Sequence, residues 1–409
     1  MAHPKILAFV LAGGKGERLF PLTAFRSKPA VPFGGRYRIV DFVLSNLVNS
    51  QIFSIYLLVQ YKSQSLIEHI RQHWVMSPIV RDQFIAVVPP QMRMGPEWFQ
   101  GTADAVFQNI NLITQHNPGL VVVFGADHIY RMDIRQMIDF HLERDAHVTV
   151  AARPVPVEEA SAFGVIKTDD ENRIIGFQEK PSNPTPMPHD SSRAYVSMGN
   201  YIFNTSVLVD ALVEAQKKRH NDFGAHILPS LVDTGRLFAY DFESNRIPGF
   251  REYEEKGYWR DVGTIRAFFD AHMDMLGERP VFELDNPLWP IYPSGQKAPA
   301  SKILSAEIEN SMIAEGVTIK GARIKNSIIR TGVVVEDDVE LEDAIIMDRS
   351  VIKRGARLRR VIVDKMNIIS EGMCIGLEGV DEQFGLHIDS SGICVIPRRG
   401  WREKDRRGV

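Results

Sequence analysis

The sequence predicts an α/β protein in which a mostly parallel sheet, covered by helices on both faces, is followed by a parallel β-helix. In the first two-thirds of the chain, apolar runs typical of buried strands alternate with segments whose apolar residues recur at helical spacing. The last third repeats a small-apolar-apolar pattern about every 17 residues, close to the length of one coil built from three hexapeptides. These two observations predict two domains.

The first domain is expected to cover residues 1–285. Its predicted strands are apolar runs bounded by turn residues: Ile6–Leu11, Ile55–Val59, Phe84–Val88, Val121–Phe124 and Val148–Ala151. Its predicted helices are Ser65–Trp74, Ala103–Gln115, Ile134–Arg144 and Ile265–Leu276. Beyond residue 150 the pattern favours hairpins, with strands at Phe163–Lys167, Ile174–Gln178, Gly199–Phe203 and Leu237–Phe242. Ligands are expected at the carboxyl ends of the parallel strands.

The repeat of the last third is carried by four segments that align with one another: Glu309–Ile313, Lys325–Ile329, Glu342–Ile346 and Arg359–Val363. Glycine corners such as Gly316–Ile319 lie between them. A sandwich of ordinary hairpins is the alternative, but hairpins rarely repeat both features at a single period. We therefore predict a hexapeptide-type β-helix over residues 300–409, ending in a basic tail and preceded by a proline-rich linker at 286–299.

Composition and charge argue against several classes of protein. The chain has 409 residues and a formal net charge of −3, so it lacks the basic balance expected of a general nucleic-acid binder. No apolar run approaches the roughly 20 residues needed to cross a bilayer, and we expect neither a membrane span nor a secretory signal. Cys374 and Cys394 form neither a disulfide framework nor a metal-ligand spacing, which favours a cytoplasmic location.

The glycine-rich turn at residues 13–16 follows the first predicted strand and is the most informative segment. Its backbone N–H groups can approach phosphate oxygens closely, and the nearby cations Lys15, Arg18 and Lys28 suit a triphosphate. The turn is not a Walker loop, because no Gly-Lys-Ser/Thr follows at the required spacing. It is not a dinucleotide fingerprint either, because Leu19 stands in place of the third glycine.

Two aspartates are placed where carboxylates can meet such a triphosphate. Asp127 follows a predicted buried strand, and Asp261 lies in a small-residue turn ahead of a helix. Each alone is equally well explained as a turn or helix-capping residue. Together with the cation-rich turn they predict a Mg²⁺ site, because Mg²⁺ takes oxygen ligands and is commonly bound beside phosphates. His69, His73 and His128 show no metal-ligand spacing and are interpreted as structural.

Further candidates lie on neighbouring loops. Lys180 follows a strand and can reach a sugar phosphate as a point charge, although a solvated surface lysine is the alternative. Gly164 would let a sugar ring approach the backbone or else marks a strand bulge. Ser197 is either a partner for a sugar hydroxyl or a satisfied strand serine. Thr102 begins a predicted helix where a base can meet backbone groups, and Gln91 can read a base edge through its amide.

These motifs resemble those of the sugar-nucleotide pyrophosphorylases. Over nearly the whole chain they resemble the bacterial glucose-1-phosphate adenylyltransferase (ADP-glucose pyrophosphorylase) family. The segments that carry the resemblance occur in the family's order: Leu11–Thr23, Lys28–Gly35, Arg38–Asn46, Trp98–Ala105, Gly125–Tyr130, Glu179–Pro181 and Tyr258–Thr264. The runs Gly34–Asp41 and Gly101–Ala105 separate the chain from uridylyl- and guanylyltransferase relatives.

The resemblance implies a Rossmann-like nucleotidyltransferase domain followed by a left-handed parallel β-helix. The implied substrates are ATP and α-D-glucose 1-phosphate, the implied products are ADP-glucose and pyrophosphate, and the implied pathway is synthesis of glycogen or another α-glucan. Mg²⁺ would be the cofactor. The resemblance also implies a homotetramer under allosteric control by anionic metabolite effectors.

The resemblance also assigns roles to individual residues. Catalysis would depend on Arg18, Lys28 and Asp127, and the metal would be held by Asp127 and Asp261. The nucleotide-binding residues would be Leu11, Ala12, Gly13, Gly14, Lys15, Gln91, Gly101, Thr102 and Asp127. Glucose 1-phosphate would contact Phe99, Gly164, Glu179, Lys180 and Ser197. Candidate ligands for an anionic effector would be Arg26, Arg36, Arg38, Arg398 and Arg399.

Two positions depart from the family pattern. Some bacterial members carry tyrosine at the position of Phe99, so a hydroxyl contact is lost here, and enteric members carry an activator-binding lysine where this chain has Phe25. Three other functions stay open: a pyrophosphorylase for another base or sugar, a catalytically inactive regulatory subunit, and an acyltransferase suggested by the β-helix. The complete set of site cations and carboxylates argues against the second, and the lack of a histidine in a repeat coil argues against the third.

Overall fold

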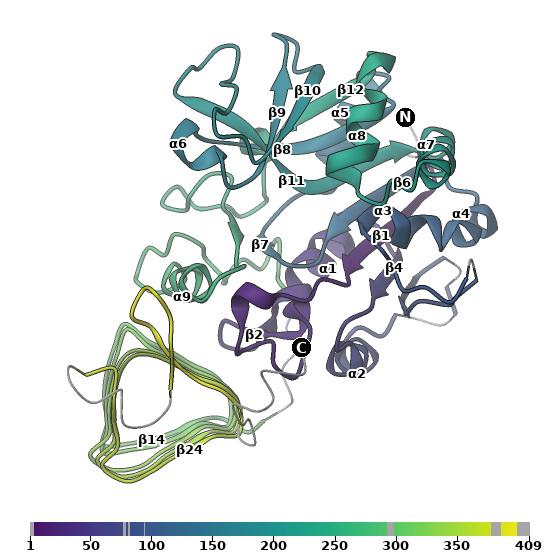
Figure 1. The fold of residues 1–409 in the computed structure, drawn as a ribbon. Helices are drawn as coiled ribbons and strands as arrows, with labels where there is room; N and C mark the ends of the chain where they lie inside the picture. Colours follow the sequence, from purple (N-terminus) through teal and green to yellow (C-terminus); the bar gives the residue numbers. More distant parts are fainter. Residues whose placement is uncertain are drawn as a thin grey trace.

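The computed structural model describes residues 4–76, 79–80, 82–93, 95–292, 298–377 and 386–398. The chain forms an α/β part and a triangular β-helix that lies against one side of it (Figure 1). The predicted α/β fold class, with a mostly parallel sheet followed by a parallel β-helix, is confirmed. Within these residues no helix is both long and apolar enough to cross a membrane.

The α/β part is built on one large sheet. Its strands are β1 (Ile6–Ala12), β4 (Ser54–Val59), β5 (Phe84–Val88), β6 (Leu120–Gly125), β8 (Val148–Pro156), β9 (Gly164–Thr168), β10 (Ile174–Glu179), β11 (Arg193–Asn204) and β12 (Leu237–Asp241). Over the described residues their order is β10-β9-β11-β6-β1-β4-β5, with β8 beside β11 and β12 beside β8. β1 lies parallel between β4 and β6, so the glycine-rich turn emerges between their carboxyl ends. β11 runs antiparallel to β6, β8 and β9, as the change of pattern beyond residue 150 predicts.

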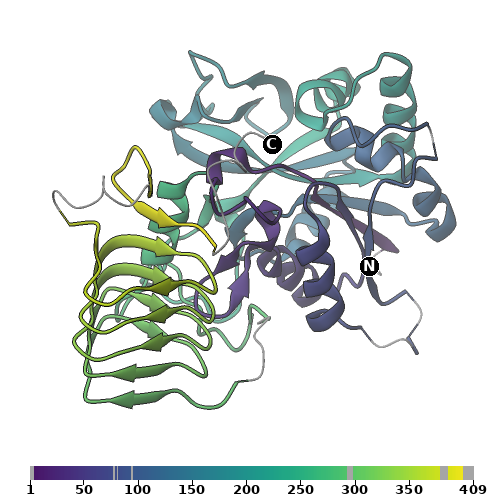
Figure 2. The same ribbon diagram turned by 60° about the horizontal axis from the view of Figure 1, so that its bottom comes forward.

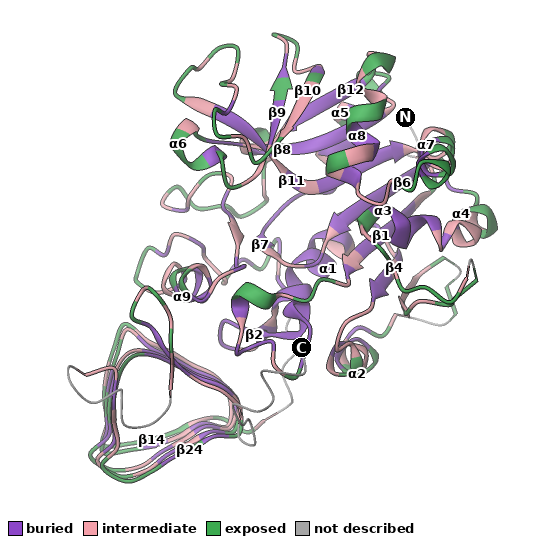
Figure 3. Cartoon of the chain, viewed as in Figure 1, coloured by how far each residue is buried: buried purple, intermediate pink, exposed green. Residues whose placement is uncertain are grey.

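Helices cover both faces of the sheet, and each face has its own core (Figure 3). The helices are α1 (Ile39–Asn49), α2 (Gln64–His73), α3 (Thr102–Phe107), α4 (Ile110–His116), α5 (Ile134–Glu143), α6 (Val157–Ala160), α7 (Thr205–Lys217), α8 (Leu228–Leu231) and α9 (Ile265–Met273). Successive β1 side chains point to opposite faces, as strand geometry requires. Ala8 and Val10 pack with α1, α2 and α5, whereas Leu7 and Phe9 pack with α3 and α7. Burial on both faces explains why β1 is an unbroken apolar run.

The segment Ala103–Gln115, predicted as one helix, forms the two helices α3 and α4, so that prediction was wrong. The break is at Asn109, whose side-chain Nδ2 donates to the carbonyl oxygen of Ala105 at 2.8 Å. The backbone N–H of Asn109 donates instead to Val106, three residues back, and its φ of −113° and ψ of 20° leave the helical region. A side-chain amide that donates a hydrogen bond to a helical carbonyl oxygen competes with the backbone N–H that would otherwise donate to that oxygen.

A short antiparallel ribbon lies outside the large sheet. It pairs β7 (His128–Tyr130) with β13 (Trp259–Asp261), and Asp261 stands opposite His128. Asp127 immediately precedes β7, so this ribbon brings together the two aspartates singled out from the sequence. A second small pair joins β2 (Pro32–Phe33) to β3 (Tyr37–Arg38) ahead of α1.

The β-helix stacks its coils in parallel register (Figure 2). One sheet contains β14 (Lys302–Leu304), β17 (Thr318–Lys320), β20 (Val334–Val335), β22 (Val351–Ile352) and β24 (Ile368–Ile369). The other contains β15 (Glu307–Glu309), β16 (Met312–Ile313), β18 (Arg323–Lys325), β19 (Ile328–Ile329), β21 (Glu340–Ile346), β23 (Arg357–Val363), β25 (Cys374–Ile375), β26 (His387–Ile388) and β27 (Cys394–Ile396). Ile319 pairs with Val335 and Val335 with Ile352 in one buried row. This register confirms the repeat found in the sequence.

The β-helix joins the α/β part through a shared apolar core. Phe33 and Phe268 of the α/β part pack there with Ile328 of the β-helix. Arg330, which is buried, donates from Nη1 to the carbonyl oxygens of Phe33 at 2.9 Å and Gly34 at 2.5 Å. The two parts therefore share both apolar packing and hydrogen bonds.

The predicted linker at 286–299 begins as a packed segment. Trp289 is buried beside α1, where its Nε1 donates to Oδ1 of Asn46 at 3.4 Å. Asn49 of α1 donates from Nδ2 to the carbonyl oxygen of Pro290 at 2.9 Å. Residues 293–297 of this linker lie outside the described residues.

His272 of α9 is a fully buried histidine at the junction of the two parts. Its Nε2 accepts the backbone N–H of Gly34 at 3.1 Å, and its Nδ1 donates to the carbonyl oxygen of Phe268 at 2.7 Å. Burial, with a smaller contribution from the Arg330 charge, lowers the pKa of His272 to about 3. The ring is therefore neutral in the folded protein at neutral pH.

Lowering the pH is expected to destabilise the protein through His272. The unfolded state binds this proton near pH 6.5 and the folded state only near pH 3, so the free energy of unfolding should fall between these values, by up to about 1.4 kcal/mol per pH unit. Urea unfolding at pH 7, 6 and 5 measures this slope. The variant His272→Gln should show a shallower slope, and a slope equal to that of the unmodified protein would contradict the assignment.

Candidate active site

A cavity of about 850 Å³ lies over the carboxyl ends of the central strands. Its wall is formed by the glycine-rich turn, the end of β6, the hairpin β9–β10, β11 and β13. Most of the residues predicted from the sequence line it: Leu11, Ala12, Gly13, Gly14, Lys15, Arg18, Lys28, Phe99, Gly101, Thr102, Asp127, Gly164, Glu179, Ser197 and Asp261. Binding at strand ends is the expected arrangement for such a sheet.

The glycine-rich turn is shaped by its neighbours as well as by its glycines. Gly16 has a φ of 65°, in the left-handed region that favours glycine, and a Cβ at Gly16 would lie 2.9 Å from the Cβ of Lys28. Thr23 donates from Oγ1 to the carbonyl oxygen of Gly16 at 3.0 Å and so closes the turn. Lys15 and Arg18 project outward, with 61% and 73% of their side chains exposed. These two cations can therefore meet an incoming anion without first being uncovered.

Lys28 lies between the two aspartates. Its Nζ is 3.0 Å from Oδ2 of Asp127 and 2.7 Å from Oδ1 of Asp261, and only 7% of its side chain is exposed. Burial alone would lower the pKa of Lys28, but the charges and hydrogen bonds of the two carboxylates outweigh burial and raise it. Burial alone would likewise raise the pKa of Asp127, but the Lys28 charge, followed by that of His128, holds it well below its usual value. Lys28 is thus an ammonium ion and Asp127 a carboxylate at neutral pH.

His128 belongs to the same cluster, although its spacing in the sequence favoured a structural role. Its Nε2 lies 3.5 Å from Oδ1 of Asp127, and one ligand atom from each of Asp127, His128 and Asp261 can be chosen so that all three lie within 4.8 Å of one another. The pairing of β7 with β13 creates this proximity, and spacing along the chain cannot reveal it. His69, in contrast, is a buried partner of Asp41 at 2.6 Å, as a structural histidine should be.

The sugar-phosphate candidates lie across the cleft from the glycine-rich turn. Glu179 of β10 stands opposite Gly164 of β9, where a Cβ would lie 3.3 Å from Oε2 of Glu179. Ser197 lies at an irregularity of β11, and its Oγ accepts the backbone N–H of Gly199 at 3.2 Å. Lys180 does not line the cavity, because its Nζ lies on the exposed surface, 3.6 Å from Oε1 of Glu179.

Phe99 is held in the cavity wall by hydrogen bonds of its backbone. Its N–H donates to Oε1 of Gln60 at 2.6 Å, and Nε2 of Gln60 donates to its carbonyl oxygen at 3.1 Å. Thr102 at the start of α3 donates from Oγ1 to Oδ2 of Asp222 at 3.0 Å. Gln91 lies apart from the cavity, where its exposed amide donates to the carbonyl oxygen of Pro89 at 2.8 Å.

Several residues that line the cleft were not proposed from the sequence: Gln60, Tyr201, Asp222, Trp259 and Gly263. Gln60 directly follows the predicted strand Ile55–Val59, so the rule of binding at strand ends could have indicated it. Trp259 and Gly263 lie in the same turn as Asp261. No sequence signal points to Asp222 or Tyr201, which reach the cleft only through the fold.

Those arginines proposed as effector ligands that the structure describes lie away from this cleft. Arg36 and Arg38 line a separate cavity of about 130 Å³ between the α/β part and the β-helix, together with Arg330, Arg349 and Lys365. Burial, followed by the charges of Arg26, Arg38 and Arg398, lowers the pKa of Lys365 to about 8.

Arg26 does not line that cavity, because it is buried in an ion pair with Asp364. The Nη2 of Arg398 lies 3.8 Å from Sδ of Met366, a residue of the cavity wall. Arg399 lies outside the described residues.

Comparison with known proteins identifies the family. A nucleotidyl transferase family model matches residues 7–278, and a model of the GlmU-like C-terminal hexapeptide region matches residues 297–396. The glucose-1-phosphate adenylyltransferase of Thermodesulfovibrio yellowstonii is 67% identical over 396 residues, which cover 97% of this chain and 96% of that protein. Enzymes of the same name from Corynebacterium jeikeium and Mycobacterium leprae are each 46% identical, over 97% of this chain and 98% and 99% of theirs. The chain therefore belongs to the glucose-1-phosphate adenylyltransferase family of nucleotidyl transferases.

Proposed function

We propose that the protein transfers AMP from ATP to α-D-glucose 1-phosphate, forming ADP-glucose and pyrophosphate for the synthesis of glycogen or another α-glucan. The names of its relatives support this reaction. The observation that carries the proposal is the meeting, in one cleft, of a glycine-rich turn with exposed cations and the Asp127–Lys28–Asp261 cluster. The glycine-rich turn with its cations suits an anionic nucleotide. The cluster of two carboxylates suits a metal-assisted phosphoryl reaction.

The residues of the cluster fit a bound Mg²⁺. Asp127 and Asp261 present carboxylate oxygens, the donors that this ion prefers, and the Lys28 ammonium between them shows that the pair accommodates a cation. Asp127 and Asp261 would hold the ion, which when bound neutralises charge on phosphate oxygens. Displacement of Lys28 from one carboxylate would turn its charge toward the triphosphate.

The reaction needs positioning rather than a covalent enzyme intermediate. An oxygen of the glucose 1-phosphate phosphate would attack the α-phosphorus of ATP in line, and the bond to the bridging oxygen would break as pyrophosphate leaves with its electron pair. Arg18 and Lys28 would stabilise the charge that moves onto pyrophosphate, and the backbone N–H groups of the glycine-rich turn would orient the triphosphate. Lys180 would offset the repulsion between the two anionic substrates.

Replacing Lys180 by alanine is expected to raise the KM for glucose 1-phosphate by about tenfold while changing kcat little, since one charged hydrogen bond contributes about 1.5 kcal/mol or more to ground-state binding. The exposed ammonium of Lys180 can turn toward a bound phosphate. Steady-state kinetics with varied glucose 1-phosphate measure the effect. The exposed Lys167 of β9 supplies the control Lys167→Ala. An unchanged KM would remove Lys180 from the site.

The nucleotide preference of the purified protein tests the proposed reaction. Pyrophosphate release is measured with glucose 1-phosphate and Mg²⁺, comparing ATP, UTP and GTP, and again after chelation of Mg²⁺. A strong preference for ATP that is lost on chelation is the expected result. Preference for UTP or GTP would keep the chemistry and change the product, and no release with any nucleotide, even with a panel of sugar phosphates present, would favour a regulatory subunit.

We further propose that anionic metabolites regulate the enzyme from the cavity between its two parts, and that it acts as a cytoplasmic homotetramer. The concentration of cationic side chains around that cavity supports an anion as the ligand. Replacing Lys365 by methionine is expected to raise the effector concentration needed for half-maximal response. Sedimentation of the purified protein measures the number of subunits.

A further inference from the structure

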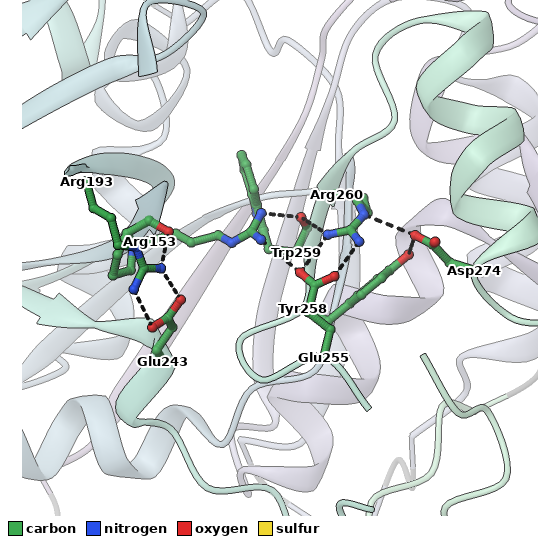
Figure 4. A network of polar contacts seen from close by, with 9 residues as sticks. Arg153, Arg193, Glu243, Glu255, Tyr258, Trp259, Arg260 and Asp274 are labelled. Atoms are coloured by element: carbon green, nitrogen blue, oxygen red, sulfur yellow. Dashed lines mark hydrogen bonds and ion pairs between the residues drawn. The ribbon is translucent and has the colours of Figure 1, made fainter. Parts of the chain in front are cut away.

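A continuous network of charged side chains lies against β13, the strand that ends in Asp261 (Figure 4). Arg153 of β8 donates from Nη1 to the carbonyl oxygen of Trp259 at 2.9 Å and from Nη2 to Oε1 of Glu255 at 2.9 Å. Arg260 donates to the same carboxylate, from Nη1 to Oε1 at 2.9 Å and from Nη2 to Oε2 at 2.5 Å. Glu255 thus joins Arg153 of the large sheet to the side chain of Arg260 in β13.

The far end of the network is fixed to α9. Nε of Arg260 donates to Oδ2 of Asp274, the residue after α9, at 3.1 Å, and the hydroxyl of Tyr258 donates to the same oxygen at 3.0 Å. The Arg260 guanidinium also lies 4.2 Å from the centre of the Tyr258 ring. β13 is therefore held by charged groups from two directions, one in the large sheet and one beyond it.

In the part of the chain that the structure describes, β13 has no strand pairing with the large sheet. Among the described residues β13 pairs only with β7. In this pair Asp261 stands opposite His128, the residue that follows Asp127. The Trp259 ring lies 4.9 Å from the His128 ring and 5.6 Å from that of Phe163. A shift of β13 would therefore change the separation of the two carboxylates directly.

Arg153 also connects β13 to the part of the cavity wall that contains Ser197. In the pairing of β8 with β11, Arg153 stands opposite Val196, and Ala152 stands opposite Ser197. Arg153, whose side chain contacts β13, is therefore the residue next to Ala152, the pairing partner of Ser197. Its guanidinium directly links β8, the strand beside Ser197, to β13, the strand of Asp261, by a hydrogen bond.

We propose that Arg153 is a positioning residue for the metal-binding carboxylates: through Glu255 and the Trp259 carbonyl it holds β13 where Asp261 and Asp127 can bind one divalent cation together. The inference rests on the metal role proposed above for those aspartates. Arg153 touches neither substrate nor metal, so its removal should weaken metal binding without removing a ligand. Partners that orient metal ligands typically contribute 10- to 100-fold to metal affinity.

The test compares Arg153→Met with the matched variant Arg193→Met. Arg193 of β11 makes the same kinds of contact, with the Pro154 carbonyl oxygen at 2.9 Å and the carboxylate of Glu243, but it does not touch β13 (Figure 4). Binding of Mn²⁺ to the full-length protein is measured from the electron paramagnetic resonance signal of free Mn²⁺, with both ATP and glucose 1-phosphate omitted, because ATP itself binds Mn²⁺. Arg153→Met should weaken Mn²⁺ binding by about tenfold, and Arg193→Met should leave it unchanged.

A second variant keeps the test informative if Arg153→Met folds poorly. In Arg153→Lys one ammonium replaces the two guanidinium nitrogens that donate separately to Glu255 and to the Trp259 carbonyl. An intermediate loss of Mn²⁺ affinity is therefore expected, at a thermal midpoint near that of the unmodified protein. Equal Mn²⁺ affinity in Arg153→Lys, Arg193→Met and the unmodified protein would overturn the positioning role while leaving the metal site intact. Failure of the unmodified protein to bind Mn²⁺ would overturn the metal site itself, and this inference with it.

Discussion

Replacing Asp127 by asparagine is expected to lower kcat for pyrophosphate release by about 10³-fold, because a metal ion contributes several kcal/mol of charge stabilisation and each 1.36 kcal/mol corresponds to a factor of ten. The amide keeps the size of the side chain but removes its charge, so Lys28 keeps only Asp261 as a carboxylate partner. Initial rates at saturating ATP and glucose 1-phosphate, measured over a range of Mg²⁺ concentrations, determine the effect.

An exposed aspartate serves as the control. Asp145→Asn removes the same charge at a position where 75% of the side chain is exposed and its partner is Arg236, outside the cleft. Its kcat and Mg²⁺ requirement should match those of the unmodified protein. If Asp127→Asn also matched the unmodified protein in both quantities, Asp127 would have no part in metal binding or catalysis.

Replacing Arg26 by methionine is expected to destabilise the protein by about 3–5 kcal/mol, the cost of leaving one charge of a buried pair uncompensated. The side chains of Arg26 and Asp364 are 3% and 1% exposed, and their ion pair joins the α/β part to the β-helix. Asp364→Leu should have a comparable effect. Urea unfolding measured at neutral pH gives the free energy of each variant.

The double variant separates the pair from its surroundings. With both charges removed, the loss should be clearly smaller than the sum of the two single losses, because neither partner is left buried alone. The exposed pair Arg354–Asp338 of the β-helix, with side chains 62% and 69% exposed, is the reference, and Arg354→Met should change the stability by less than about 1 kcal/mol. Losses that simply add in the double variant would show that Arg26 and Asp364 act independently.

The elements that can be predicted well from the sequence are those whose signals lie within a few residues. The apolar run of β1, the glycine-rich turn after it and the coil repeat each follow from side-chain periodicity or turn chemistry. The failure at Asn109 has an equally local cause, since one amide takes the Ala105 carbonyl while the apolar spacing continues across the break. Periodicity records which face is buried, but it does not record such competition.

The composition of the site required more than local patterns. The family motifs nominated Arg18, Lys28, Asp127 and Asp261, and the fold brings all four to one cleft. That His128 joins the carboxylates, and that Arg153 reaches β13, depends on pairing between β7 and β13 and on packing of β8 against a distant loop. Gln91 is an opposite case: its amide could read a base edge, as the sequence predicts, but it lies outside the cavity.

Chain-local physics therefore accounts for the α/β sheet, the β-helix and the glycine-rich turn, since burial pattern and backbone freedom act within each segment. The relative positions of charged groups depend on contacts between segments far apart in the chain, and these contacts form only when the whole molecule packs. Lys28 shows the difference: its sequence context predicts a cation near phosphate, but its burial between two carboxylates is a property of the folded structure.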